Sequence, residues 1–155
     1  MTASWNHRQP KMKYWSSKVE YQGKMFDSNR ERDRFIYLKH LERNGKISQL
    51  RTQVSFQIIP PTMRTVPIRM KTKVKYEERC VEQDAEYTCD FLYIESGKYV
   101  CEEFKSEQTA KLADYVLRRK LMIRKIYDHN AKRRGQWIFR EVVYRMRGST
   151  TIEDK

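Results

Sequence analysis

The sequence lacks any run of about 18 apolar residues, the length at which a helix is able to cross a bilayer. Its first 18 residues carry four basic side chains but no apolar stretch of about 7–15 residues, which a secretory signal requires. We therefore expect neither a membrane span nor secretion, and we expect the protein to act in the cytoplasm.

Cysteine and histidine are scarce as well, with three residues of each type. An odd number of cysteines without a CxxC pair does not make a disulfide framework. Histidines that are scattered singly do not predict a structural zinc site. The residues concerned are Cys80, Cys89, Cys101, His7, His40 and His129.

Acidic residues are outnumbered, because 33 Lys and Arg stand against 20 Asp and Glu and leave a net charge of +13 in 155 residues. A chain of this length is expected to form a single domain with a sizeable core. A positive surplus of this size predicts a polyanionic partner, most simply nucleic acid.

The positive charge is concentrated at the two ends of the chain. Residues 118–147 hold eleven basic side chains against two acidic ones, whereas the middle of the chain is nearly balanced. Basic runs are often only solvated faces, but this density favours contacts with phosphates. The residues that we predict to contact DNA are Lys71, Lys73, Lys75, Lys111, Arg118, Arg119, Arg124, Lys125, Lys132, Arg133 and Arg134.

Periodicity and turn residues predict a mixture of helices and strands. A hairpin or short strand is expected at 20–26, with a turn at Gln22-Gly23, and a helix from Asp27-Ser28 to Arg43, ended by Asn44-Gly45. Strands are expected at 47–59, 70–76, 87–94, 99–105 and 137–144, and a second helix at 109–130. The strand at 70–76 would present Lys71, Lys73 and Lys75 on one face. The buried stripe of the second helix would consist of Leu112, Tyr115, Val116, Met122, Ile123 and Ile126.

This order of elements predicts an α/β domain with a mixed β-sheet flanked by α-helices. We expect one domain over residues 19–147, a basic arm over 1–18 and a disordered tail over 148–155. Trp5, Tyr14 and Trp15 of the arm would stack on unpaired bases, or would dock on the domain or on a dimer partner.

The predicted hairpin of strands 87–94 and 99–105 brings charged residues together. Whether its loop has two or four residues, Asp90 lies opposite Glu103, and Lys105 stands diagonal to Asp90 on the same face. Two facing carboxylates need compensation. Either Lys105 alone supplies it, in a structural ion cluster, or a divalent cation does.

Glu31 is a third acidic candidate. The segment Ser28-Asn29-Arg30-Glu31 matches a capping box, in which Glu31 reaches back to the Ser28 amide. However, Glu31, Phe35 and Leu38 also fall on the stripe of the helix that should face the core. Capping and a role in a functional site both remain open for Glu31.

Asp90, followed one strand later by Glu103-Phe104-Lys105 and preceded by a helical Glu31, resembles the PD-(D/E)XK nuclease superfamily. Residues 19–127 are similar, more narrowly, to small bacteriophage endonucleases of the Holliday junction resolvase type. The segments that carry this resemblance are FDSNRERDRF, LRTQVSF and YTCDFLYIESGKYVCEEFKS. Cys89 stands in place of the Pro of the superfamily motif, and Ser106 stands where a Gly often follows the Lys.

The resemblance implies a restriction-endonuclease-like fold and a Mg²⁺-dependent DNA endonuclease, with Mn²⁺ as a substitute metal. Asp90, Glu103, the Phe104 carbonyl and Glu31 would hold the metal, and Lys105 would position the attacking water. Gln53 would assist, or would be an ordinary strand residue. The amides at the start of the helix near Thr109 would meet a phosphate.

The resemblance also implies branched DNA as the substrate, a homodimer, and action in the host cytoplasm if the gene is phage-borne. Two alternatives remain at this stage. One is a transposition-associated or general endonuclease of the same fold. The other is a DNA-binding protein without catalysis, which would gain nothing from two carboxylates facing DNA.

Overall fold

The computed structural model describes residues 18–133 and 136–155. The predicted roles of Trp5, Tyr14 and Trp15, of Arg134 and of the Arg133 side chain lie outside the described residues. The chain divides into two compact units, residues 1–37 and 38–155. The boundary falls inside helix α1 (Asn29–Arg43), and the predicted arm over 1–18 lies, apart from Lys18, outside the described residues.

The first unit contains a small hairpin followed by the start of α1. Strands β1 (Val19–Tyr21) and β2 (Lys24–Phe26) are joined through Gln22 and Gly23, whose φ values of 52° and 72° are those of a type I′ turn. The aromatic rings of Phe26 and Phe35 pack with their centroids 5.1 Å apart. The predicted hairpin and helix are therefore confirmed.

α1 ends at the predicted Asn44-Gly45. Gly45 adopts a φ of 67°, which allows its amide to donate to the Glu42 carbonyl and the Lys46 amide to donate to the Leu41 carbonyl. This pair of bonds is a Schellman motif. It reverses the chain so that strand β3 begins at Ile47.

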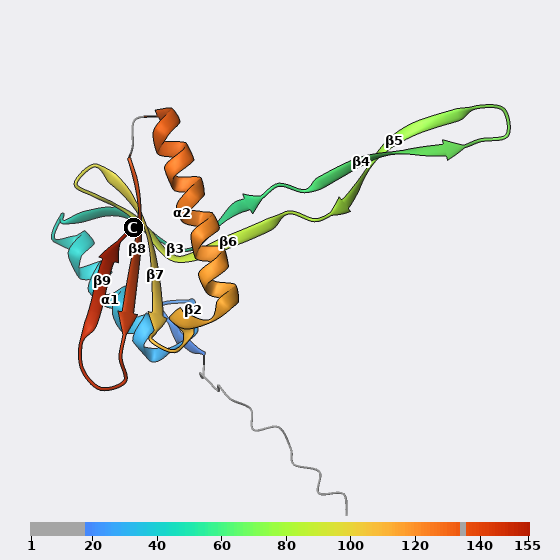
Figure 1. Ribbon diagram of the computed structural model, residues 1–155. Coiled ribbons are helices and arrows are strands. Elements are labelled where there is room, and N and C mark those ends of the chain that lie inside the picture. Colours follow the sequence, from blue (N-terminus) through green and yellow to red (C-terminus); the bar gives the residue numbers. More distant parts are fainter. Residues whose placement is uncertain (1–17, 134–135) are drawn as a thin grey trace, which may run out of the picture. The chain divides into compact units, whose positions relative to one another are not determined.

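The second unit is built on a five-stranded mixed sheet (Figure 1). Its strands, in spatial order, are β3 (Ile47–Ile59), β6 (Ala85–Glu95), β7 (Lys98–Ser106), β8 (Trp137–Tyr144) and β9 (Thr150–Asp154). β7 and β8 run parallel, and the other neighbours run antiparallel. The fold is therefore α/β with a mixed sheet, as predicted.

Helix α2 (Ala113–Arg133) packs on this sheet. Its buried Met122 and Ile126 join Tyr87, Cys89, Leu92, Cys101 and Phe139 in one apolar core, so the two strand cysteines are core residues. The predicted start at Thr109 is wrong, because residues Thr109–Lys111 form a separate 3₁₀ turn and Leu112 is extended. Leu112 is accordingly 52% exposed and does not belong to the buried stripe. Neither helix of the described residues is long and apolar enough to cross a membrane.

A two-stranded ribbon is inserted between β3 and β6. It consists of β4 (Thr62–Arg69) and β5 (Val74–Glu82), and two residues on each side, Pro60-Pro61 and Gln83-Asp84, join it to the sheet. The predicted strand at 70–76 is confirmed only for Val74–Tyr76, which begin β5; residues 70–73 form a turn in which Met70 donates its amide to the Lys73 carbonyl. The alternation of Lys and apolar residues continued across this turn, and no Gly, Pro or Asn marked it.

The predicted disorder of residues 148–155 is also wrong. Residues Thr150–Asp154 form β9, which pairs with β8. The Arg140 guanidinium contacts both carboxylate oxygens of Asp154, at 2.6 and 2.9 Å. All five side chains of β9 are exposed, so the strand is held by backbone pairing and by this ion pair. Its sequence lacks the alternation of apolar and polar residues from which a strand is predicted.

Candidate functional site

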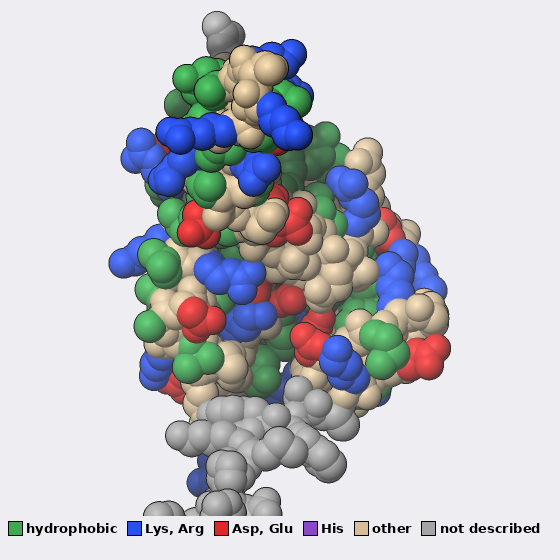
Figure 2. Space-filling view, turned by 90° about the vertical axis from the view of Figure 1, so that its right-hand side faces the viewer, with side chains coloured by type: hydrophobic (Ala, Val, Ile, Leu, Met, Phe, Trp, Pro, Cys, Tyr) green, Lys and Arg blue, Asp and Glu red, His purple; other side chains and the backbone are tan. Residues whose placement is uncertain are grey.

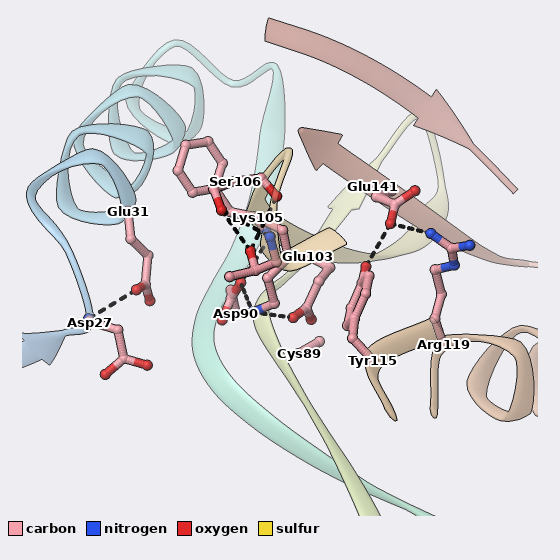
Figure 3. A network of polar contacts seen from close by, with 12 residues as sticks. Asp27, Glu31, Cys89, Asp90, Glu103, Lys105, Ser106, Tyr115, Arg119 and Glu141 are labelled. Atoms are coloured by element: carbon pink, nitrogen blue, oxygen red, sulfur yellow. Dashed lines mark hydrogen bonds and ion pairs between the residues drawn. The ribbon is translucent and has the colours of Figure 1, made fainter. Parts of the chain in front are cut away.

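Asp90 on β6 and Glu103 and Lys105 on β7 point toward one another (Figure 3). Lys105 Nζ lies 2.5 Å from Glu103 Oε1 and 3.5 Å from Asp90 Oδ2. Both carboxylates are buried, and the Lys105 side chain is largely buried. The predicted convergence of two carboxylates and one ammonium is therefore present.

The register of the hairpin explains this convergence. Residues 91–95 of β6 pair with residues 102–98 of β7, as predicted, around a turn in which Ser96 and Gly97 both have positive φ. The regular pairing stops one residue before Asp90 and Glu103. There the Phe104 amide donates to Asp90 Oδ2 at 2.8 Å, so a side chain replaces the backbone partner.

Gln53 approaches Asp90 from the other neighbouring strand. In the β3–β6 register Gln53 falls opposite Asp90, and its Nε2 donates to Asp90 Oδ1 at 3.4 Å. Gln53 has a φ of 52°, which is unfavourable for a residue with a side chain. Strained backbone of this kind concentrates at functional sites. The structure thus brings the predicted Gln53 to the carboxylate pair.

Burial controls the electrostatics of the pair. Burial and the neighbouring Asp90 charge raise the pKa of Glu103 to about 7, although Lys105 opposes this shift. Burial likewise raises the pKa of Asp90. Burial alone would lower the pKa of Lys105, but the charges of Asp90 and Glu103 outweigh it and raise that pKa. Lys105 is therefore a permanent cation, and the carboxylates are left incompletely compensated.

One oxygen of this cluster is suited to a cation. Glu103 Oε2 and the Tyr87 hydroxyl are both buried, and neither forms a hydrogen bond within 3.5 Å among the described residues, but the two groups lie close enough to interact with each other. Leaving a buried carboxylate oxygen unsatisfied is costly, and hard oxygen ligands suit Mg²⁺. The described residues contain no group of three His, Cys, Asp or Glu side chains that could hold a metal ion. The side chains of Asp90 and Glu103 would thus need backbone carbonyl or water ligands to complete a site.

A further buried carboxylate, which sequence reasoning missed, lies beside Glu103. Glu141 on β8 pairs in register with Glu103 and accepts hydrogen bonds from the Tyr115 hydroxyl at 2.7 Å and from Arg119 at 2.6 Å. Lys155 also contacts Glu141. The ring of Tyr115 in turn lies 6.0 Å from Lys105 Nζ. An acidic residue in the middle of the apolar segment WIFREVVY was the available signal.

Glu31 lies in the first unit, where it takes part in capping α1. Its amide donates to Ser28 Oγ at 3.1 Å, and its Oε2 accepts from the Asp27 amide at 2.9 Å. The reach-back contact is therefore shifted by one residue from the predicted Ser28 amide. Glu31, Phe35 and Leu38 are all buried, as the stripe predicted.

Several predicted DNA contacts are engaged within the fold. Arg118 donates to the Glu86 carbonyl and Lys125 to the Gln57 carbonyl, so both reach from α2 to the sheet. Arg119 binds Glu141, as described above. Lys111 pairs with Glu107 and Arg124 with Asp128, both on exposed surface. Lys132 is exposed on α2, Lys71 and Lys73 lie in the turn of the ribbon, and Lys75 lies 3.9 Å from Glu77 on β5.

Ser106, directly after Lys105, begins the turn that leads to α2. Its Oγ accepts from the Thr109 amide at 3.1 Å. Because α2 starts only at Ala113 and carries Asp114 in its first turn, the predicted phosphate contact at amides near Thr109 has no helix to support it.

Comparison with known proteins places the chain in one family. A family model described as "Protein of unknown function (DUF1064)" matches residues 11–146. Neither the curated proteins nor the solved structures contain a significant match to the chain.

Proposed function

The chain belongs to the DUF1064 family, and we propose that it is a Mg²⁺-dependent DNA endonuclease with a restriction-endonuclease-like fold. The observation that carries this proposal is the buried Asp90–Glu103 pair, bridged by the single ammonium group of Lys105. Two buried carboxylates beside one ammonium group leave a negative charge that a bound divalent cation would compensate.

Asp90 and Glu103 would hold the metal through their side chains, and Phe104 through its backbone carbonyl. Bound Mg²⁺ would polarise the scissile phosphate and lower the pKa of a water molecule. The Phe104 amide and Gln53 Nε2 each donate to Asp90, and this fixes the orientation of that carboxylate. Fixed ligand orientation matters because misplaced ligands lose metal affinity.

Lys105 would act as a fixed positive charge. Its raised pKa keeps Nζ protonated at neutral pH, so Nζ is able to donate hydrogen bonds to a phosphate oxygen or to the attacking water. The same protonation argues against Lys105 as the base that removes a proton from the water.

DNA is the proposed partner, because the net charge is +13 and exposed basic residues remain on α2 and on the ribbon. The similarity to junction-resolving endonucleases adds branched DNA as the preferred substrate. The same similarity predicts a dimer, because symmetric cleavage of a junction needs two sites and one chain supplies only one Asp90–Glu103 pair.

The test is a cleavage assay on a synthetic four-way junction, a flap, a duplex and a single strand, with Mg²⁺ or with EDTA. Asp90→Asn and Glu103→Gln should abolish cleavage and should bind DNA as well as the parent protein or better. Asp84→Asn and Glu86→Gln are matched controls, since they make the same changes at exposed positions near the start of β6 and should cut normally.

Cleavage at the parental rate by either site variant would contradict the proposal, as would cleavage in EDTA. DNA binding without cleavage of any substrate would instead favour a non-catalytic DNA-binding protein.

A further inference from the structure

The β4–β5 ribbon separates its charges along its length. Residues 67–76, the part of the ribbon from the Pro67–Tyr76 pair to the turn, contain four basic residues and no acidic one. Residues 77–86, which lead back to the sheet, contain five acidic residues and a single arginine. The basic residues of this outer part, here called the tip, are Arg69, Lys71, Lys73 and Lys75.

The ribbon is exposed on both faces. All nine side chains of β5 are exposed, and on β4 only Val66 and Ile68 are partly covered. Figure 2, seen from the side toward which the ribbon extends in Figure 1, shows Lys and Arg side chains near exposed hydrophobic ones in its upper part. Tyr76, next to the tip lysines, is 68% exposed. Exposed apolar side chains among cations are typical of a contact surface.

The register of the ribbon adds an electrostatic reason for an anionic partner. Arg64 pairs directly with Arg79 across the two strands, and like charges at paired positions are destabilising. Glu77 compensates in part, because it lies 3.6 Å from Arg79. Lys71, Lys73 and Arg69 lie beyond this acidic residue, toward the turn.

The dimensions of the ribbon suit duplex DNA. Each strand rises about 3.3 Å per residue, so the eight residues of β4 span roughly 26 Å. The major groove of B-form DNA, about 12 Å wide and about 8.5 Å deep, admits a two-stranded β-ribbon. The deep and narrow major groove of an RNA helix does not.

We propose that the β4–β5 ribbon is a duplex-binding arm whose basic tip enters the major groove of B-form DNA beside the cleavage site. This inference rests on the proposed function, because it takes DNA as the partner. Binding by the arm requires neither the metal nor Asp90 and Glu103. Tip lysines contact the phosphates that border the groove, and the exposed side chains beside them contact base edges.

A second copy of the chain is the other conceivable occupant of the ribbon. Pro67 on β4 has no amide hydrogen to offer to another strand, and charged residues on edge strands oppose edge-to-edge pairing. Two tips with four basic residues each would also repel one another. These features favour a polyanion over self-association.

The test compares two double variants that remove the same charge. Lys71→Ala with Lys73→Ala changes the turn of the ribbon. Lys46→Ala with Lys98→Ala changes two exposed lysines far from it in the fold, one just before β3 and one at the start of β7, opposite the last residue of β6. Binding to a fluorescent 30-base-pair duplex is measured in EDTA, so that cleavage does not interfere. Methylation of guanine N7 by dimethyl sulfate reports contact in the major groove.

The tip variant should bind about tenfold more weakly than the control variant, with a salt slope smaller by about 0.9 for each phosphate that it no longer neutralises. Guanine N7 protection should disappear with the tip lysines and stay with the control. Lys71→Arg with Lys73→Arg should restore affinity, which excludes a folding defect as the cause. The Asp90→Asn variant should bind and protect the duplex like the parent protein.

Equal affinities of the tip and control variants would overturn the arm, as would protection of adenine N3 in the minor groove in place of guanine N7. A tip variant that changes sedimentation from dimer to monomer at unchanged DNA affinity would make the ribbon a self-association surface. If Asp90→Asn cuts DNA while the tip variant loses binding, the nuclease site is wrong and the arm stands. If Asp90→Asn is inactive while the tip variant binds normally, the arm is wrong and the nuclease site stands.

Discussion

Glu103 and Glu141 occupy paired positions on the parallel strands β7 and β8, yet their environments displace their pKa values in opposite directions. Burial and Asp90 raise the pKa of Glu103 to about 7. Burial would raise the pKa of Glu141 too, but hydrogen bonds from Lys155, Tyr115 and Arg119 outweigh it and hold that pKa below its ordinary value. Neighbouring carboxylates with opposed shifts are a frequent sign of divided roles. Glu141 is the satisfied structural member, and Glu103 is the member that is free to change its partner.

The raised pKa of Glu103 predicts opposite pH dependences for stability and for metal binding. Without metal, the folded protein holds the Glu103 proton more tightly than the unfolded chain, so stability is greatest below pH 4.5 as far as this group is concerned and declines as pH rises to about 7. Mg²⁺ must displace that proton, so its affinity should rise over the same range. Calorimetric titration with Mg²⁺ at pH 6 and pH 8 checks this, and equal affinities would contradict it.

The lowered pKa of Glu141 predicts the opposite sign. Its contribution to stability is present above its ordinary pKa and is lost as pH falls through its folded value. Glu141→Gln should cost about 3 kcal/mol at pH 7, because it leaves Arg119 and Lys155 without their buried partner. The difference from the parent protein should shrink at pH 3.5 in urea unfolding. Glu153→Gln, at an exposed partner of Lys155, is the control and should change little.

Lys105→Met should separate the cluster's structural role from its chemical one. Removal of the ammonium leaves two buried carboxylates facing each other, so the metal-free variant should lose on the order of 3 kcal/mol at pH 8 and less at pH 5, where Glu103 is protonated. Mg²⁺ should restore much of the thermal stability, whereas cleavage should stay at least about 100-fold below the parental rate. Lys111→Met, which removes an exposed ion pair, serves as the control. Parental cleavage by Lys105→Met would exclude Lys105 from the chemistry.

Glu31→Gln tests whether Glu31 does more than cap α1. Glutamine retains an oxygen for the Asp27 amide, so this variant should unfold within about 0.5 kcal/mol of the parent protein, whereas Glu31→Ala should cost about 1 kcal/mol. The similarity to nucleases predicts that the stable Glu31→Gln variant loses cleavage. If it cuts normally, capping is the role of Glu31.

The junction-resolving assignment predicts a C2 dimer, because symmetric cleavage of a four-way junction needs two sites related by a two-fold axis. Affinity for the junction should exceed affinity for the duplex, and both should fall steeply with salt. Sedimentation with and without DNA measures the assembly. A monomer on DNA, or equal affinities, would remove the resolvase assignment and leave a general nuclease.

The hairpin that carries Asp90 and Glu103 was predictable because its information is local. Ser96-Gly97 permits a tight turn with positive φ, and the register then follows along both strands by alternation. The helix α1 and strands β3 and β8 were predicted for similar reasons, since capping residues and apolar patterns mark their ends.

The parts that were missed depend on partners far away in sequence. Glu141 is buried and satisfied through Tyr115 and Arg119 on α2 and through Lys155, and no local pattern brings these together. β9 exists through its pairing with β8. Gln53 was predicted only as a candidate. Its positive φ and its place opposite Asp90 depend on the pairing of β3 with β6, which the local sequence does not determine.

The joint between the ribbon and the sheet has a consequence for spacing along DNA. It has two residues on each side, and on one side these are Pro60-Pro61, whose rings restrict rotation. Asp90 lies on β6, the strand that continues from this joint. If the tip is anchored in a groove, the distance from the tip to the scissile phosphate depends on the number of residues in the ribbon strands. Each strand residue adds about 3.3 Å, which is close to the roughly 3.4 Å between successive nucleotides. Under the proposed function, a ribbon lengthened by two residues in each strand should keep its faces and shift the cut by about two nucleotides, so the insertion would act as a ruler.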